Sequence, residues 1–148
     1  MAPASGIEIC PLDTVGITEF QMPSSHETNL VQIAPGTIDD LFVHHFQTDQ
    51  LIVVRGSLVL AVLENGTYRY IWMSECDFKV VRIPPGVPHG AINLSDATCI
   101  AINSVIRHGA PYARDYQPLA QPIPYDLEAV RALAAKLQAA PVASACAR

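Results

Sequence analysis

The chain has 148 residues, of which 50% are hydrophobic and 16% are charged, and its formal net charge is -5. This length suits one domain with a substantial core and is short for two. The lysines and arginines are scattered, which argues against a surface for nucleic acid. No stretch approaches the roughly eighteen continuous apolar residues of a membrane span, and residues 1–10 lack a signal-peptide pattern. We therefore expect a cytoplasmic protein that binds neither nucleic acid nor membrane.

The four cysteines do not form a recognisable framework. They stand at positions 10, 76, 99 and 146, with no Cys-x-x-Cys pair and no regular spacing. Zinc knuckles and disulfide-rich domains both depend on such spacing. We therefore expect buried or incidental thiols.

Short β-rich runs separated by turn residues follow one another between residues 29 and 107, without a useful helical period. We expect a barrel over residues 29–108, preceded by an extension over residues 1–28. The predicted strands of its first half are residues 30–33, 41–47, 51–55 and 57–63, with bends at Pro35-Gly36, Thr48-Asp49 and Gly56.

Asn65-Gly66 is the sharpest turn signal, because both residues tolerate the positive φ angles of a tight hairpin. It predicts that residues 58–64 pair with residues 67–73. The second of these strands has an aromatic face that includes Tyr68 and Tyr70. Both tyrosines are candidates for ligand binding, with packing inside the barrel as the alternative.

The second half of the barrel is predicted from strands at residues 79–83, 89–94 and 98–106. A proline-rich tail follows within residues 109–148. In that tail Asp126 is placed to cap a helix that runs to Gln138 and buries one apolar stripe against a sheet or a partner subunit.

The run PPGVPHGAIN, residues 84–93, has a Pro-x-Gly turn, then a histidine after two intervening residues and an asparagine after three more. This resembles the second motif of the cupin superfamily. The resemblance implies an all-β double-stranded β-helix, a jelly-roll barrel, with a short C-terminal helix in this chain. In such a barrel His89 points inward at the open end.

The first cupin motif is matched less fully. Gly56 lies seven residues after Asp49, and His45 lies four before it, so His45 and Asp49 take the places of the motif's second histidine and its glutamate. Val43 stands where the first histidine is expected. His44 is one residue out of register and, in a regular strand, would face the opposite side from His45.

A second resemblance involves other residues. The sequences HFQ at residues 45–47, QLIVVRG at residues 50–56 and IPPGVPHG at residues 83–90 are similar to the dTDP-4-dehydrorhamnose 3,5-epimerase type and the related deoxysugar-nucleotide ketoisomerases. Those are metal-free cupins. The resemblance implies a sugar or nucleotide-sugar ligand, no cofactor, and proton transfer beside a ketone.

Such chemistry needs a base, a group that stabilises the enolate, and an acid. By resemblance His45 is the base, with Asp49 as its orienter and His89 as the other central residue. Gln47 supports the ligand, and Gln50 replaces the lysine that stabilises the enolate in the family.

The family's late-strand tyrosine, its acid, is missing from residues 101–105, and Tyr68 or Tyr70 could substitute for it. Arginines are well shaped to bind a diphosphate. Arg55 is the candidate we take forward, while Arg69 and Arg82 are also near predicted strands.

Two alternatives stay open. A metal-dependent dioxygenase or isomerase would bind iron, manganese or zinc through His45, His89 and Asp49, with His44 as a fourth ligand. A non-catalytic cupin would bind its ligand without turnover. Whichever holds, we expect a homodimer, because cupins commonly pair through outer strands such as residues 98–106.

Overall fold

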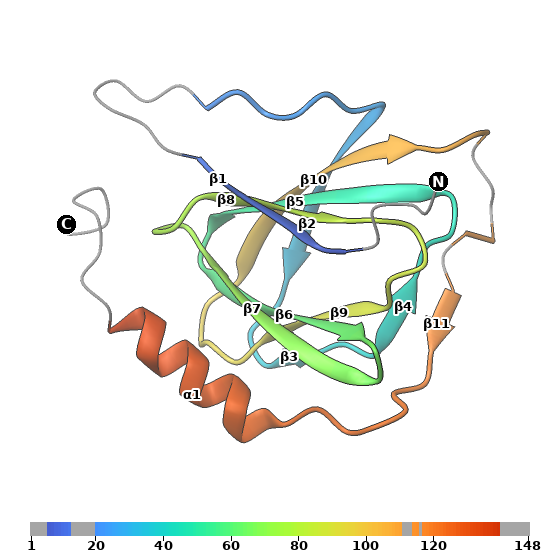
Figure 1. The fold of residues 1–148 in the computed structure, drawn as a ribbon. Coiled ribbons are helices and arrows are strands. Elements are labelled where there is room, and N and C mark those ends of the chain that lie inside the picture. The colour runs from blue at the N-terminus through green and yellow to red at the C-terminus, as the bar shows by residue number, and fades with distance from the viewer. Residues whose placement is uncertain (1–5, 13–19, 111–113, 116, 140–148) are drawn as a thin grey trace.

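The computed structural model describes residues 6–12, 20–110, 114–115 and 117–139. Within these residues the chain forms eleven strands and one helix, and the strands make two antiparallel sheets that face each other as a flattened barrel (Figure 1). The predicted all-β jelly roll with a C-terminal helix is therefore confirmed. No helix in the described part of the chain is long and apolar enough to cross a membrane.

The first sheet has five strands in the order β1-β8-β5-β10-β2. Their bounds are β1 Glu8–Pro11, β8 Lys79–Ile83, β5 Gln47–Arg55, β10 Cys99–Arg107 and β2 Glu27–Ile33. The second sheet has the order β11-β4-β9-β6-β7, and β3 also pairs with β9. Its members are β11 Gln117–Leu119, β4 Leu41–Val43, β9 His89–Asn93, β6 Ser57–Glu64, β7 Thr67–Ser74 and β3 Thr37–Ile38.

The predicted hairpin is confirmed. Strands β6 and β7 pair from Leu58 opposite Met73 to Glu64 opposite Thr67. The turn between them has φ angles of 52° at Asn65 and 77° at Gly66, which is the left-handed region that this residue pair tolerates.

Two apolar layers hold the sheets in place. The inner layer lies between the two sheets, and its fully buried members include Leu60, Val62 and Val81. The outer layer lies between the second sheet and helix α1, Leu127–Gln138, where Val130 is buried. The helix begins as predicted, because the Asp126 carboxylate accepts the Ala129 N–H.

The chain bends earlier than the sequence predicts. The expected strand over residues 41–47 stops at Val43, and residues 44–46 form a bend before β5 starts at Gln47. The bend expected at Thr48-Asp49 is absent, since both residues belong to β5. The difference matters because a bend rotates the side chains that precede it relative to those that follow.

Three short strands were not predicted. Strand β1 extends the first sheet beside β8, β3 pairs with β9, and β11 extends the second sheet beside β4. Strands β1 and β11 come from outside the 29–108 range. The sheets therefore take in parts of both segments that flank it.

The described cysteines include free thiols and a disulfide-bonded residue. Cys10 and Cys99 are free, and Cys99 is buried. Cys76 is disulfide-bonded, so the expectation of an incidental thiol was wrong at that position. Residue 146 lies outside the described residues.

Candidate functional site

A pocket of about 140 Å³ lies in the interior of the barrel, between the two sheets. Its polar side chains are His44, Asp49, His89 and Asn103, with Asp39 also on the lining. The rest of the wall is mostly apolar and comes from both sheets, through Val31, Ile33, Phe42, Leu51, Val53, Leu58, Leu60, Met73, Ala91 and Ala101. An apolar cavity with a few convergent polar groups is the usual form of a ligand site.

His89 is fixed at the start of β9 by the turn before it. Its Nδ1 lies 2.9 Å from the Val87 carbonyl oxygen, and since a carbonyl can only accept, Nδ1 carries the hydrogen. Its Nε2 lies 3.3 Å from Asp49 Oδ2, and both side chains are nearly inaccessible to solvent. Both ring nitrogens of His89 therefore face oxygen acceptors.

Asp49 stands at the centre of the polar cluster. Its Oδ1 accepts hydrogen bonds from Gln47 Nε2 at 2.6 Å and Asn103 Nδ2 at 3.0 Å. Burial raises the pKa of this carboxyl, but hydrogen bonds from His89 and Asn103 and the nearby histidines outweigh it and hold the pKa below its usual value. Asp49 is therefore a buried carboxylate.

His44, which the sequence placed on the opposite side, lines the pocket. Its Nε2 lies 3.8 Å from Asp49 Oδ2 and its Nδ1 lies 3.8 Å from Asp115 Oδ2. Burial lowers the pKa of His44, and the charges of His89 and Arg107 act in the same direction, against the raising effect of the two carboxylates. His44 is thus biased toward the neutral imidazole, the form that can accept a proton.

Asp115 is a site residue that the sequence analysis missed. Its Oδ1 accepts the backbone N–H groups of His45 at 2.7 Å and Phe46 at 3.0 Å, so it stabilises the bend from a point 70 residues away. The His44 carbonyl oxygen also accepts the Gly86 N–H at 2.7 Å. No motif marks Asp115, because only the folded chain brings it to the bend.

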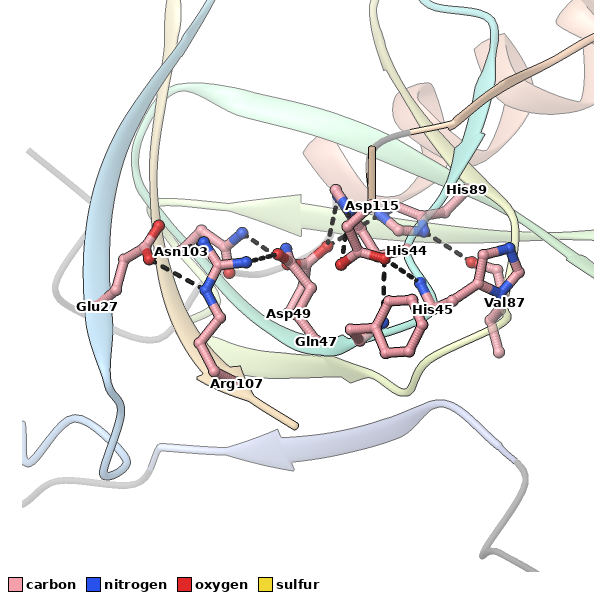
Figure 2. A network of polar contacts seen from close by, with 11 residues as sticks. Glu27, His44, His45, Gln47, Asp49, Val87, His89, Asn103, Arg107 and Asp115 are labelled. Atoms are coloured by element: carbon pink, nitrogen blue, oxygen red, sulfur yellow. Dashed lines mark hydrogen bonds and ion pairs between the residues drawn. The ribbon is translucent and has the colours of Figure 1, made fainter. Parts of the chain in front are cut away.

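The histidine assigned as the base from the sequence is elsewhere. The side chain of His45 is exposed, while Asp49, His44, His89 and Asp115 converge (Figure 2). The structure therefore brings together His89 and Asp49 from the predicted catalytic set, and the side chain that lines the pocket beside them is His44, not His45. The bend at residues 44–46 is the cause, because it removes the regular alternation on which the predicted orientation depended.

Of the predicted ligand-binding residues on β5, one belongs to the polar cluster and two lie away from the pocket. Gln47 is buried within the cluster. Gln50 is fully buried outside the pocket, where its side-chain amide donates to Ser24 O and Ser104 O. Arg55 is exposed and is the last residue of β5, whereas Gln47 is the first.

The two tyrosines do not line the pocket. Tyr68 and Tyr70 pack in the outer apolar layer beneath α1, where Tyr68 Oη donates to Ile123 O at 2.6 Å. The aromatic face of β7 was correctly predicted, but it faces the helix. Residues 71 and 73 of that strand face the inner layer instead.

The cluster contains the kinds of side chain, histidine and carboxylate, that a metal site would use. Within the described residues, no group of three or more histidine, cysteine, aspartate or glutamate side chains is positioned to hold a metal ion. His89 Nδ1 binds a carbonyl and Asp49 Oδ1 binds two amides, whereas His89 Nε2 and Asp49 Oδ2 lie beside each other, 3.3 Å apart.

No protein-family model matches the sequence, and no curated protein is significantly similar to it. Solved structures are similar. The capsular polysaccharide assembling protein CapF from Staphylococcus aureus is 23% identical with a TM-score of 0.59, and the match covers 69% of this chain but only 30% of that one. A dTDP sugar isomerase from Desulfovibrio desulfuricans is 15% identical with a TM-score of 0.63, over 84% of this chain and 92% of that one.

A third structure, dTDP-4-dehydrorhamnose 3,5-epimerase from Sulfolobus tokodaii, is 20% identical with a TM-score of 0.55. The match covers 69% of this chain and 65% of the epimerase. At these identities the similarity concerns the fold. The chain has the cupin fold of the deoxysugar-nucleotide epimerases and isomerases.

Proposed function

We propose that this chain binds a deoxysugar nucleotide and moves a proton on the carbon beside the sugar's ketone, as an isomerase or epimerase. The observation that carries the proposal is the neutral-biased His44, held between two buried carboxylates at the polar end of an apolar pocket. The names of the structurally similar proteins support the substrate class.

His44 is the proposed base. Asp115 Oδ2 is buried, has no hydrogen-bond partner in the described residues and lies 3.8 Å from His44 Nδ1, so a hydrogen on Nδ1 would be directed at it. That tautomer leaves Nε2 to take the proton from carbon. The imidazolium that results is stabilised by Asp49 and Asp115, and the 3.8 Å contacts are of the kind that tighten when substrate binds.

His89 is the proposed partner of the substrate oxygen. Its Nδ1 donates to Val87 O, so Nε2 is the ring atom that faces the pocket, 3.3 Å from Asp49 Oδ2. A hydrogen on Nε2 that is shared between Asp49 Oδ2 and the substrate oxygen would stabilise the developing enolate and lower the barrier to its formation. The same group can return a proton, which answers the lack of a tyrosine in the pocket.

The pocket suits the sugar rather than the nucleotide. Its volume of about 140 Å³ is small beside the several hundred Å³ of a typical cofactor or drug site, so it accepts one ring. Its largely apolar wall favours a sugar that has lost hydroxyl groups over a fully hydroxylated one, since each unpaired buried hydroxyl is costly.

Solvent deuterium exchange tests the proposal. The protein is incubated in D2O with a dTDP-linked 4-keto-6-deoxyhexose, and NMR follows deuterium entering the carbon beside the ketone. We expect exchange by the native chain and a loss of at least about 100-fold in His44→Asn, the scale of general base catalysis. His45→Asn, the adjacent exposed histidine, is the matched control and should keep native exchange.

Two outcomes would contradict the proposal. Equal losses in the two variants would remove His44 from the role of base. Saturable binding of the sugar nucleotide with no exchange by the native chain would favour a protein that binds without turnover.

A further inference from the structure

Two side-chain amides hold the carboxylate of Asp49 on the side away from the histidines. Gln47 Nε2 and Asn103 Nδ2 both donate to Oδ1, at 2.6 and 3.0 Å. Oδ2 is the oxygen that lies near His89 and His44. One carboxylate oxygen therefore binds the two amides, and the other faces the two histidines.

Each amide can present either an oxygen or an NH2 group, and only the NH2 group suits a carboxylate. Asn103 is oriented by the main chain, because its Oδ1 accepts the Gln50 N–H at 3.0 Å. Gln47 is oriented by a side chain, since its Oε1 accepts from Arg107 Nη1 at 2.7 Å. A guanidinium has only donors, so it can bind the oxygen end of Gln47 and no other.

Arg107 is itself anchored. Its Nε and Nη2 donate to Glu27 Oε2 at 3.2 and 2.7 Å. Glu27 also accepts from Asn29 Nδ2, and this bond together with Arg107 lowers the pKa of Glu27. A line of contacts thus runs from β2 through β10 to β5 and the pocket (Figure 2).

We propose that Gln47 and Arg107 are positioning residues of the candidate site. Arg107 fixes the Gln47 carboxamide with its NH2 group toward Asp49, and this holds Oδ1 so that Oδ2 stays directed at the two histidines. The inference deepens the proposed function, because it assigns the orientation of Asp49 within the same site. A reversed Gln47 would place oxygen against oxygen and turn the carboxylate away.

Hydrogen exchange of the Gln47 side-chain NH2 group, measured by NMR on the ligand-free protein, tests this. In Arg107→Met we expect exchange to accelerate about tenfold or more, the loss of one hydrogen bond to a charged group. Arg107→Lys keeps a charged donor for Oε1 and should restore slow exchange. Arg69→Met is the matched control, because Arg69 is half-exposed and its contact with Glu64 is 4.0 Å long.

The NH2 group of Asn103 is the internal reference. It binds the same Asp49 oxygen but is oriented by the main chain, so its exchange should accelerate clearly less than that of Gln47 in Arg107→Met. Equal acceleration at both amides would indicate general loosening and overturn the proposal, as would native exchange at Gln47 in Arg107→Met.

A second variant, Glu27→Gln, weakens the anchor and leaves the guanidinium in place. It should produce a smaller acceleration at Gln47 alone, and native exchange there would contradict the anchoring role of Glu27. Neither measurement needs a substrate. Failure here would therefore leave the deuterium exchange test of the proposed function intact, and the reverse also holds.

Discussion

At the scale of single residues, the site depends on charges held where water is scarce. Asp49 remains a carboxylate because amide and imidazole donors surround it, and His44 is biased toward neutrality because it is buried. Both folded-state pKa values lie below the unfolded ones. The unfolded chain then binds more protons at intermediate pH, so stability falls as the pH falls.

This gives a prediction for unfolding. The contribution of His44 is fully present above its ordinary pKa of 6.5 and is lost as the pH falls below that value, whereas that of Asp49 is lost below 3.8. Urea unfolding between pH 7.5 and 5 should therefore lose less stability in His44→Asn than in the native chain. If the free energy of unfolding fell equally steeply with pH in the two proteins, the assigned direction of the His44 pKa shift would be contradicted.

Asp115 allows the bend and the chemistry to be separated. Asp115→Ala removes the acceptor for two backbone N–H groups and should cost about 1–3 kcal/mol in urea unfolding, with loss of deuterium exchange. Asp115→Asn keeps the oxygen that binds those groups but not the charge beside His44. Asp115→Asn should retain most of the stability but should reduce the rate of deuterium exchange into the substrate. A native rate of deuterium exchange in this variant would rule out the carboxylate's role.

At the scale of elements, the helices, strands and turns that depend on residues close together in sequence could be predicted. The Asn65-Gly66 hairpin, the Asp126 cap and the strand after Pro84-Pro85-Gly86 all follow from neighbours in sequence. The bend at residues 44–46 could not be predicted, because its partners, Asp115 and Gly86, are distant in sequence. Because of that bend, His44 lines the pocket where the sequence analysis expected His45.

Strand β9 gives a prediction at this scale. A Cβ at Gly90 would lie 2.7 Å from Tyr125 Oη and 2.9 Å from the Asp40 carbonyl oxygen. Gly90→Ala should therefore destabilise the chain by about 1–3 kcal/mol in urea unfolding. Adding Tyr125→Phe removes one of the two contacts and should recover part of the loss. A Gly90→Ala protein as stable as the native one would contradict the packing described.

At the scale of the whole molecule, the barrel was predictable because the Pro-Gly-His turn and the alternating strands agree. It was less predictable which side chains of the second sheet face the inside of the barrel and which face α1. Tyr68 and Tyr70 alternate correctly but face outward, since α1 makes the outer face of the second sheet a second core. Periodicity identifies two faces without saying which of them the helix covers. The homodimer and the cytoplasmic location stay predictions.

The central claim is that the inner pocket, lined by His44, Asp49 and His89, receives the sugar nucleotide. Backbone amide NMR during titration with a dTDP-linked 4-keto-6-deoxyhexose tests it most directly. We predict that the largest shift changes fall in residues 42–51 and 87–91. No saturable change there, or changes confined to the groove between α1 and the second sheet near Trp72 and Arg131, would contradict the account.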